Sequence, residues 1–180
     1  MRFHHRLQTR ALSGGVLLLA AALAAGAPAQ ADVAGRATVF DADTIGINGQ
    51  RIRLHGIDAP EYGQQCLDSG DQPYGCGKAA ARALRKFIGA APVVCSPRAI
   101  DRYGRMVARC LVRDESLNAW LVRQGYAVAY RRYSGDYVAE ESEARNARRG
   151  LWSGAFDAPW KWRNDHRRAH DAPAPARQTD

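Results

Sequence analysis

The sequence contains no Cys-x-x-Cys pair, and none of its histidines stands near the cysteines with the spacing of a zinc site. Structural zinc sites are built from closely spaced cysteine and histidine ligands, so the sequence excludes this class of metal site. No internal repeat is visible either. The 180 residues therefore suit one domain, which is long enough to bury a core without depending on metals or disulfides alone.

Long apolar runs are scarce, and the run near the amino-terminal end is too short to span a membrane. Leu12 to Ala25 falls short of the roughly 20 residues that a membrane-spanning helix needs. Three arginines and no acid precede this run, and Ala29-Gln30-Ala31 has the small-x-small pattern of a cleavage site. Residues 1–31 are therefore predicted to be a secretory signal, with a retained anchor as the alternative. Cleavage near Asp32 would give a secreted or periplasmic protein without stable membrane insertion.

Acidic residues are fewer than basic residues, and the formal charge at pH 7 is +8. Removal of the expected signal, with its three arginines, would lower this charge without reversing it. A positive surface favours polyanions such as nucleic acids, although many secreted proteins are basic for solubility alone. The charge is therefore compatible with a nucleic-acid partner and does not identify one.

Cysteines are few, but their number is even. Behind a secretory signal, an even number indicates disulfides rather than free buried thiols, which are the alternative. Cys66 and Cys76 bracket a loop rich in Gly, Asp and Pro, whereas Cys95 and Cys110 lie about symmetrically around a turn near Arg102. We therefore predict the pairs Cys66–Cys76 and Cys95–Cys110, each of which would stabilise the fold by roughly 3 kcal/mol in the chain-entropy model.

The stretch from Val39 to Glu61 organises the rest of the chain. Runs with strand character flank Asn48-Gly49, a pair typical of hairpin turns. Because a hairpin brings its open ends together, we expect Asp43 and Asp58 to lie close in space. Two close carboxylates repel unless a cation lies between them, and their hard oxygens suit Ca²⁺ or Mg²⁺. The planar guanidinium of Arg53 suits two phosphate oxygens, so the stretch indicates a metal-assisted site for a phosphate ester.

Four motifs follow one another along the chain. They are D-x-D-T at Asp41 to Thr44, R-L-x-G-I-D-A-P-E at Arg53 to Glu61, D-R-Y-G-R at Asp101 to Arg105 and L-V-R-Q-G-Y-A at Leu121 to Ala127. Each motif alone is weak, but the four in this order, from about Ala37 to Trp152, closely resemble the staphylococcal nuclease (thermonuclease) family. The resemblance implies a Ca²⁺-dependent phosphodiesterase on an OB-fold barrel. The family usually has glycine where this chain has Ala42, and glycine permits a backbone conformation that alanine resists. The difference therefore affects the fine geometry of the D-x-D-T loop and not the carboxylates.

The resemblance also implies roles for the acids. Asp43 and Asp58 would bind the metal together with the backbone carbonyl of Ala59, where the family usually has a threonine. Glu61 would activate or orient a water for attack on phosphorus. Asp41 is a candidate for an outer acid or a structural one. The alternatives are turn-forming aspartates and an exposed loop glutamate.

Arginines of the motifs are candidates for phosphate contacts. Arg53 and Arg105 would hold the scissile phosphate, because preorganised guanidinium groups stabilise the charge that develops there. Arg102 would contact a neighbouring phosphate. Surface ion pairs are the alternative for these residues. The basic residues beyond Ala158 are interpreted as a solvated end, with weak binding of nucleic acid as the alternative.

Aromatic residues of the motifs are candidates for base contacts. Tyr103 and Tyr130 match positions that flank the nucleotide in the family, and Tyr133 competes with Tyr130 for this match. Stacking of bases on aromatic rings tolerates any sequence, which predicts little base specificity. Ordinary packing is the alternative for all three tyrosines, and the four tryptophans are interpreted as packing residues.

Periodicity and turn residues predict five strands and about three helices. The expected strands are three within Ala37 to Asp58, one at Val93 to Cys95 and one at Met106 to Val112. The expected helices are Lys78 to Ile88, Asp114 or Ser116 to Gln124, and Asp136 to Arg149. This set fits an α+β, mainly β fold, a five-stranded barrel of OB topology, with a plain α+β domain as the fallback.

The predicted order is a signal at residues 1–31, a nuclease domain at residues 32–157 and a basic tail rich in Pro and Ala at residues 158–180. We expect a secreted, monomeric, Ca²⁺-dependent phosphodiesterase that cuts DNA and RNA with low sequence specificity. The alternative is a non-catalytic OB-fold module that binds nucleic acid, and the acids and arginines of the motifs favour the enzyme. A structural protein stabilised by its disulfides is a third possibility and would bind no metal.

Overall fold

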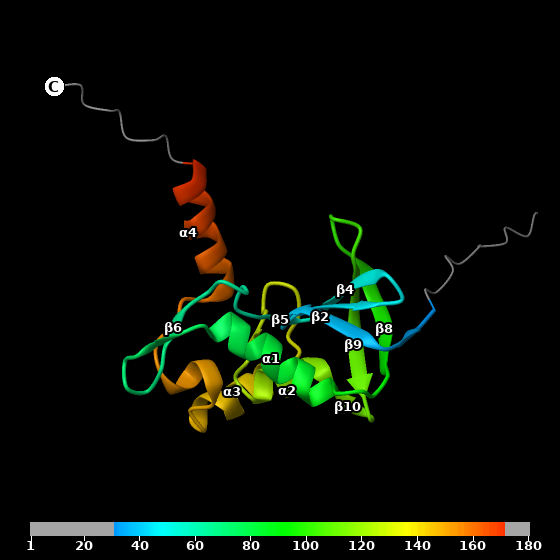
Figure 1. Ribbon diagram of the computed structural model, residues 1–180, viewed down its shortest axis with the longest axis horizontal. Coiled ribbons are helices and arrows are strands. Elements are labelled where there is room, and N and C mark those ends of the chain that lie inside the picture. Colours follow the sequence, from blue (N-terminus) through cyan, green and yellow to red (C-terminus); the bar gives the residue numbers. More distant parts are fainter. Residues whose placement is uncertain (1–30, 172–180) are drawn as a thin grey trace, which may run out of the picture.

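The computed structural model describes residues 31–171 (Figure 1). The expected secretory signal lies outside the described residues except for Ala31, and so do residues 172–180 of the expected tail. Among the described residues, no helix combines the length and the apolar character that crossing a membrane requires.

Short strands and four α-helices make up the fold. The strands are β1 (Val33–Gly35), β2 (Ala37–Asp41), β3 (Thr44–Ile47), β4 (Gln50–Leu54), β5 (Ile57–Asp58), β6 (Cys66–Leu67), β7 (Pro73–Tyr74), β8 (Val93–Ile100), β9 (Met106–Val112), β10 (Glu115–Ser116) and β11 (Val128–Ala129). The helices are α1 (Cys76–Ile88), α2 (Leu117–Arg123), α3 (Val138–Asn146), the 3-10 helix η1 (Gly150–Ser153) and α4 (Pro159–Asp171).

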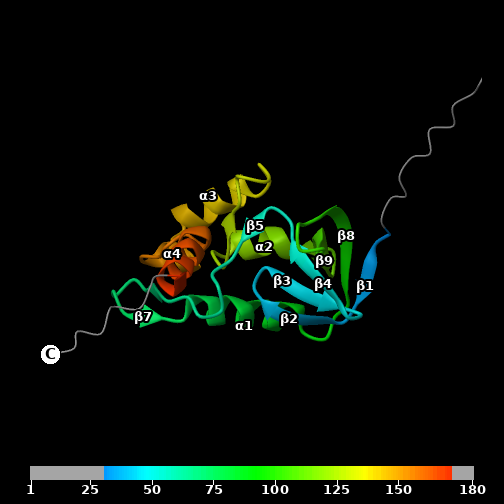
Figure 2. The same cartoon turned by 90° about the horizontal axis from the view of Figure 1, so that it is seen from above.

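The main sheet has the order β1-β8-β9-β4-β3-β2, with β10 paired to β9. β4 runs parallel to β9, and the other pairs in this sheet are antiparallel. Two smaller ladders pair β5 with β11 and β6 with β7. The strands of the main sheet gather at one end of the molecule, with α1 along one side, and the β6–β7 ladder lies with α4 toward the other end (Figure 2). This mixed, mainly β arrangement confirms the expected α+β class with a barrel of OB topology.

The β3–β4 hairpin forms where the sequence predicts it. Asn48 and Gly49 have φ angles of 51° and 79°, the left-handed conformation that a tight hairpin turn of this kind requires. On its strands, apolar side chains alternate with polar ones, so that one face is fully buried. The buried side chains are Ile45, Ile47, Ile52 and Leu54. This alternation fixes the register and leaves Arg53 on the opposite face.

Helix α1 closes one side of the core with an amphipathic face. Its buried residues Ala80, Leu84 and Ile88 recur at helical spacing. A guanidinium nitrogen of Arg85 donates to the backbone carbonyl of Val39 at 3.1 Å, which ties the helix to β2. The helix begins at Cys76, two residues before the expected start at Lys78.

Both predicted disulfides are confirmed. Cys66 and Cys76 join the short β6 strand to the start of α1, with Cα atoms 5.7 Å apart. Cys95 and Cys110 lie directly opposite each other on β8 and β9, with Cα atoms 4.1 Å apart. The described residues include no free cysteine.

The segment after Ala158 differs from the solvated tail that the sequence predicted, because its first part is helix α4. Pro159 occupies the first helical position, where its fixed φ favours a helix and its missing N–H costs nothing. Lys161 pairs with Asp157 at 3.0 Å and with Asp165 at 2.8 Å, which supports the first turns. The described residues thus contain four α-helices instead of about three.

Candidate active site

The two central aspartates come from the β2–β3 turn and from β5, and they meet at one arginine. Asp43 follows β2 and Asp58 ends β5, and their exposed fractions are 4% and 0%. A guanidinium nitrogen of Arg53 lies 3.0 Å from Asp43 Oδ2 and 2.8 Å from Asp58 Oδ1. The hairpin register explains this arrangement, because Arg53 lies directly opposite Thr44 on the neighbouring strand. The structure therefore brings together the two acids that the sequence paired.

Asp43 is held firmly in its orientation. Its Oδ2 accepts the backbone N–H of Ala59 at 3.0 Å, while its Oδ1 accepts the hydroxyl of Thr44 and a guanidinium N–H of Arg53, both at 3.1 Å. The bond from Ala59 crosses from the β2–β3 turn to the end of β5. Hydrogen bonds of this kind compensate the cost of burying a carboxylate.

Asp41 adds a third carboxyl group behind Asp43. Its Oδ1 accepts the backbone N–H of Asp43 at 3.1 Å. Burial and the neighbouring charge of Asp43 raise the pKa of Asp41 to about 7. Asp41 therefore carries only part of a negative charge near neutral pH.

Glu61 and Asp58 share a second arginine, which sequence analysis assigned to the solvated end. Arg163 of α4 donates to both oxygens of Asp58, at 3.0 and 2.8 Å, and to Glu61 Oε1 at 2.9 Å. Burial acts against its charge, but the bonds to Asp58 and Glu61 raise the pKa of Arg163 above its ordinary value. Burial also disfavours the charged form of Asp58 and raises its pKa, whereas the hydrogen bonds from Arg163 lower this pKa.

The donor set fits a hard divalent cation. The side chains that meet here are the carboxylates of Asp43, Asp58 and Glu61, and carboxylate oxygens are ligands that Ca²⁺ prefers. A guanidinium already bridges Asp58 and Glu61, so a positive charge is accommodated between them. No group of three or more His, Cys, Asp and Glu side chains is arranged as a metal site within residues 31–171. Backbone carbonyl and water would therefore have to complete the ligands of a bound cation.

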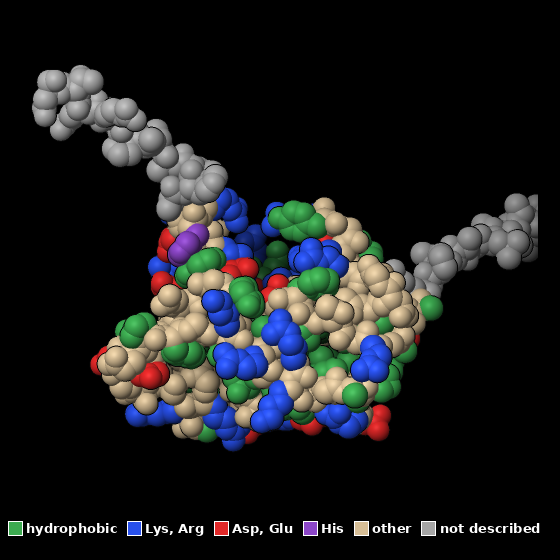
Figure 3. Space-filling model, in the orientation of Figure 1, with side chains coloured by type: hydrophobic (Ala, Val, Ile, Leu, Met, Phe, Trp, Pro, Cys, Tyr) green, Lys and Arg blue, Asp and Glu red, His purple; other side chains and the backbone are tan. Residues whose placement is uncertain are grey.

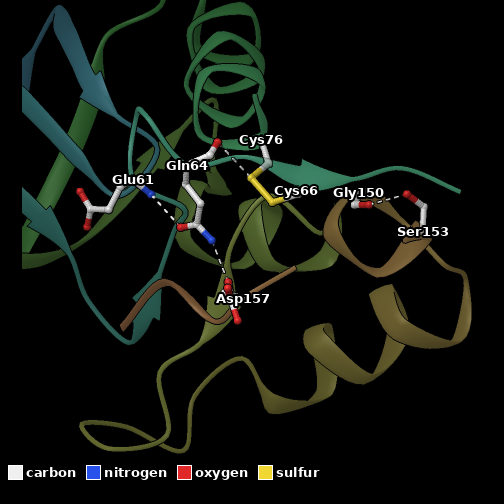
Figure 4. Close-up of a disulfide and its surroundings, with 7 residues drawn as sticks. All are labelled: Glu61, Gln64, Cys66, Cys76, Gly150, Ser153 and Asp157. Carbon is white, nitrogen blue, oxygen red and sulfur yellow. Dashed lines mark hydrogen bonds between the residues drawn. A yellow bond between two sulfur atoms is a disulfide. The ribbon is translucent and has the colours of Figure 1, made fainter. Parts of the chain in front are cut away.

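The backbone of Glu61 is supported from behind by Gln64. Figure 4 shows Gln64 between Glu61 and Asp157, beside the Cys66–Cys76 disulfide. Its amide oxygen accepts the N–H of Glu61 at 3.3 Å, and its amide nitrogen donates to the carbonyl of Asp157 at 2.7 Å. Gln64 is fully buried. No local pattern indicates this role, since the partner of Gln64 is 93 residues away.

The third group of candidates lies at the β8–β9 turn. Asp101 accepts the N–H of Tyr103 and two bonds from Arg105, of which the side-chain bond measures 2.7 Å. Partial burial opposes these bonds, but together they lower the pKa of Asp101. In the described structure Arg105 is thus paired with Asp101 and does not contact the central acids. Tyr103 is 71% exposed, and the guanidinium of Arg102 lies 5.2 Å from the centroid of its ring.

Figure 3 shows a hollow between α4 and the β8–β9 turn, with acidic side chains at its base and basic side chains around it. Tyr130 lies against α4 and is tied to the chain before β5 by a bond from its N–H to the carbonyl of Gly56 at 2.9 Å. Its ring stacks on Trp160 of α4 with centroids 5.6 Å apart, and Tyr133 meets it edge-on at 4.9 Å. Both candidate tyrosines therefore belong to one aromatic cluster.

Comparison with known proteins gives a consistent set of relatives. The family described as "Staphylococcal nuclease homologue" matches residues 51–154. Micrococcal nuclease of Shigella flexneri is 33% identical over 179 residues, which cover 89% of this chain and 94% of that protein. An uncharacterized endonuclease of Escherichia coli O157:H7 is 35% identical over 143 residues, 74% of this chain and 87% of that protein. The succinoglycan biosynthesis protein ExoI of Rhizobium meliloti (strain 1021) is 38% identical over 141 residues, 77% of this chain and 74% of that protein. Helix α4 begins beyond the residues that the family description matches.

Proposed function

Because the chain belongs to the staphylococcal nuclease family, we propose that it is a secreted, Ca²⁺-dependent phosphodiesterase that cuts DNA and RNA with low sequence specificity. The observation that carries this proposal is the meeting of two buried carboxylates, Asp43 and Asp58, at the guanidinium of Arg53. A buried acid pair of this kind costs free energy, and catalysis is a reason for a fold to maintain it.

The carboxylates of Asp43 and Asp58 and the carbonyl of Ala59 would hold the cation. A bound Ca²⁺ would supply positive charge next to a phosphate oxygen and lower the pKa of a water molecule. Asp41, whose pKa is raised to about 7 by burial and by Asp43, would carry only part of a negative charge near neutral pH, so the attraction for the cation would come mainly from Asp43 and Asp58.

The chain's own residues would perform the remaining tasks. Arg53 and Arg105 would donate hydrogen bonds to the equatorial oxygens of the scissile phosphate and stabilise the charge of the five-coordinate state. Glu61 would orient the attacking water and accept its proton. Its side chain is 36% exposed, so water can reach it. Arg105 would first have to exchange its contact with Asp101 for the phosphate.

The hollow between α4 and the β8–β9 turn is the proposed path of the nucleic acid (Figure 3). Arg102 would contact a phosphate next to the scissile one, and Tyr103 would stack on a base. Tyr130, or Tyr133 beside it, would stack on a base at the other side of the acids. Stacking accepts any base, which supports low specificity. The disulfides support an oxidising compartment, in agreement with secretion.

The test is degradation of single-stranded DNA by the purified, oxidised protein, with Ca²⁺ and with excess EGTA. Asp43→Asn keeps the shape of the side chain and removes the charge, so we expect it to abolish cleavage. Asp71→Asn is the matched control, because Asp71 is exposed on the β6–β7 loop. Cleavage that persists in EGTA or in Asp43→Asn would contradict the proposed use of the cation.

A non-catalytic nucleic-acid-binding module is the second candidate, and the pairing of Arg163 with Asp58 and Glu61 favours it, because paired acids are not free to bind a cation. This candidate predicts that the folded protein binds the same oligonucleotide in Ca²⁺ without cutting it. A filter-binding or anisotropy measurement beside the cleavage assay distinguishes the two candidates.

A further inference from the structure

Helix α4 touches the candidate site with two side chains from one of its faces. Trp160 and Arg163 are three positions apart, so they project from the same side of the helix. Trp160 stacks on Tyr130 with an interplanar angle of 10°, and Arg163 contacts Asp58 and Glu61. One helix face therefore covers an aromatic ring and two acids that the proposed function assigns to substrate and cation.

We propose that Arg163 is a resident counter-charge that competes with the divalent cation for Asp58 and Glu61, so that helix α4 sets the cation affinity of the site. The inference rests on the proposed function for the position of the cation. The proposal adds that Arg163, which lies outside the residues matched by the family, controls access of the cation to Asp58 and Glu61.

The contacts of Asp58 show why the two charges compete. Asp58 is fully buried, and both of its oxygens accept bonds from Arg163, while Oδ1 also accepts a bond from Arg53 at 2.8 Å. A divalent cation on Asp58 would lie next to the Arg163 guanidinium in a poorly solvated place, where like charges repel strongly. The cation can therefore bind fully only when Arg163 withdraws from the carboxylate.

The way in which α4 is attached to the rest of the fold allows Arg163 to withdraw from Asp58. The chain just before the helix is held by the bond from Gln64 to the carbonyl of Asp157, and Pro159 is buried. Beyond this base the helix projects away from the body of the molecule (Figure 1). Arg163 lies one turn from the fixed base, and the residues from Asn164 to Arg168 are exposed. The helix can shift at Arg163 without disturbing the core.

Linkage makes the effect reciprocal. If Arg163 lowers the affinity for the cation, then the cation must weaken the contact of Arg163 with the acids by the same factor. Removal of the guanidinium also leaves Asp58 and Glu61 with less positive charge around them. Both effects predict that loss of Arg163 increases cation affinity, whereas loss of a merely structural contact would leave the affinity unchanged or reduce it.

The test is calorimetric titration of the folded, oxidised protein with Ca²⁺ in the absence of substrate. We expect Arg163→Gln to lower the dissociation constant about 10-fold, since a hydrogen-bonded ion pair no longer opposes the cation. Arg167→Gln is the matched control, because Arg167 is an exposed arginine one turn further along the same helix. An unchanged or weaker affinity in Arg163→Gln would overturn the inference.

A second measurement follows the helix itself. We expect Ca²⁺ to accelerate amide hydrogen exchange in residues 160–168 of the original protein, and Arg163→Gln to show fast exchange there without Ca²⁺. Arg163→Lys keeps a charge without the two-pronged contact and should lie between the two in cation affinity. If Arg163→Gln does not fold, Arg163→Lys replaces it in both measurements. Exchange that is unaffected by Ca²⁺ would contradict the proposal.

The two proposals fail in different ways. Ca²⁺-dependent cleavage together with equal cation affinities of the original protein and Arg163→Gln would overturn the role of Arg163 and leave the nuclease intact. Failure of both proteins to bind Ca²⁺ in the titration, together with no cleavage, would overturn both proposals.

Discussion

Asp58 has no exposed surface, and the two guanidinium groups that contact it counteract the burial that raises its pKa. Removing one partner of such a pair leaves a buried charge without compensation, which typically costs about 3–5 kcal/mol. A substitution at Asp58 or Arg53 therefore mixes an effect on stability with an effect on chemistry. Glu61 is different, because its side chain is 36% exposed and its loss leaves water as a replacement.

Glu61→Gln is expected to lower turnover about 100- to 10,000-fold, the usual contribution of a positioned base. Glutamine keeps the shape and an oxygen acceptor, so the melting temperature should stay nearly the same. Steady-state cleavage and thermal unfolding measure the two quantities. Glu143→Gln is the control, since Glu143 is a surface glutamate on α3 that also pairs with an arginine. An unchanged rate in Glu61→Gln would remove Glu61 from the mechanism.

At the scale of the element, the start of α1 packs directly on the backbone of the Glu61 loop. A Cβ atom built on Gly77 would overlap the carbonyl oxygen of Glu61, and backbone atoms on both sides cannot yield easily. The close approach places the helix and the loop in one rigid unit with the Cys66–Cys76 disulfide. The position of Glu61 therefore depends on a glycine in a different element.

Gly77→Ala is expected to destabilise the protein by roughly 1–3 kcal/mol, the usual cost of overpacking, and to lower the cleavage rate by displacing Glu61. Gly75→Ala is a matched control in the same turn, because the nearest atom to its added Cβ is a flexible Lys78 carbon at 3.7 Å. Urea unfolding and cleavage assays compare the two variants. Equal stabilities would show that the α1 start adjusts without cost.

The two disulfides should differ in their effect on activity. Each closes a short loop, with separations of 10 and 15 residues, so replacing either pair by serines should cost about 3 kcal/mol of stability. Cys66 and Cys76 adjoin Gln64, so their loss should also lower the cleavage rate under conditions where the protein is folded. Cys95 and Cys110 lie between β8 and β9, so their loss should change stability alone. Equal cleavage rates would contradict this distinction.

Elements with strong local signals could be predicted from the sequence. The alternation of Ile45, Ile47, Ile52 and Leu54 around Asn48-Gly49 specifies a hairpin by itself. The disulfide pairs could be predicted because the cysteines flank local turns. The expected helix from Asp136 to Arg149 is too long, because Tyr137 has a left-handed φ of 64° and α3 spans only Val138–Asn146.

At the scale of the whole molecule, the features that the sequence could not reveal depend on distant partners. Arg163 contacts acids more than 100 positions away, and the stack of Trp160 on Tyr130 has no local signature. The segment looked like a polar tail because its apolar contacts are made by single residues and not by a periodic stripe. Candidate residues within motifs could be named in advance, whereas residues that reach the site from another part of the fold could not.

The excess of basic over acidic residues and the hollow with basic surroundings together predict binding that weakens with salt. Each phosphate contact on a single strand contributes a slope of about −0.7 to the logarithm of affinity against the logarithm of salt concentration. We expect Arg102→Gln to reduce the slope by about this amount, because the proposed contact of Arg102 is with a phosphate.

Arg82→Gln is the control, since Arg82 is exposed on α1 and has no proposed contact. Anisotropy titrations of a fluorescent oligonucleotide at several salt concentrations, in EGTA to prevent cleavage, give both slopes. Equal slopes for the two variants would mean that Arg102 contributes only to the general charge, and the β8–β9 turn would then be excluded as a wall of the substrate path.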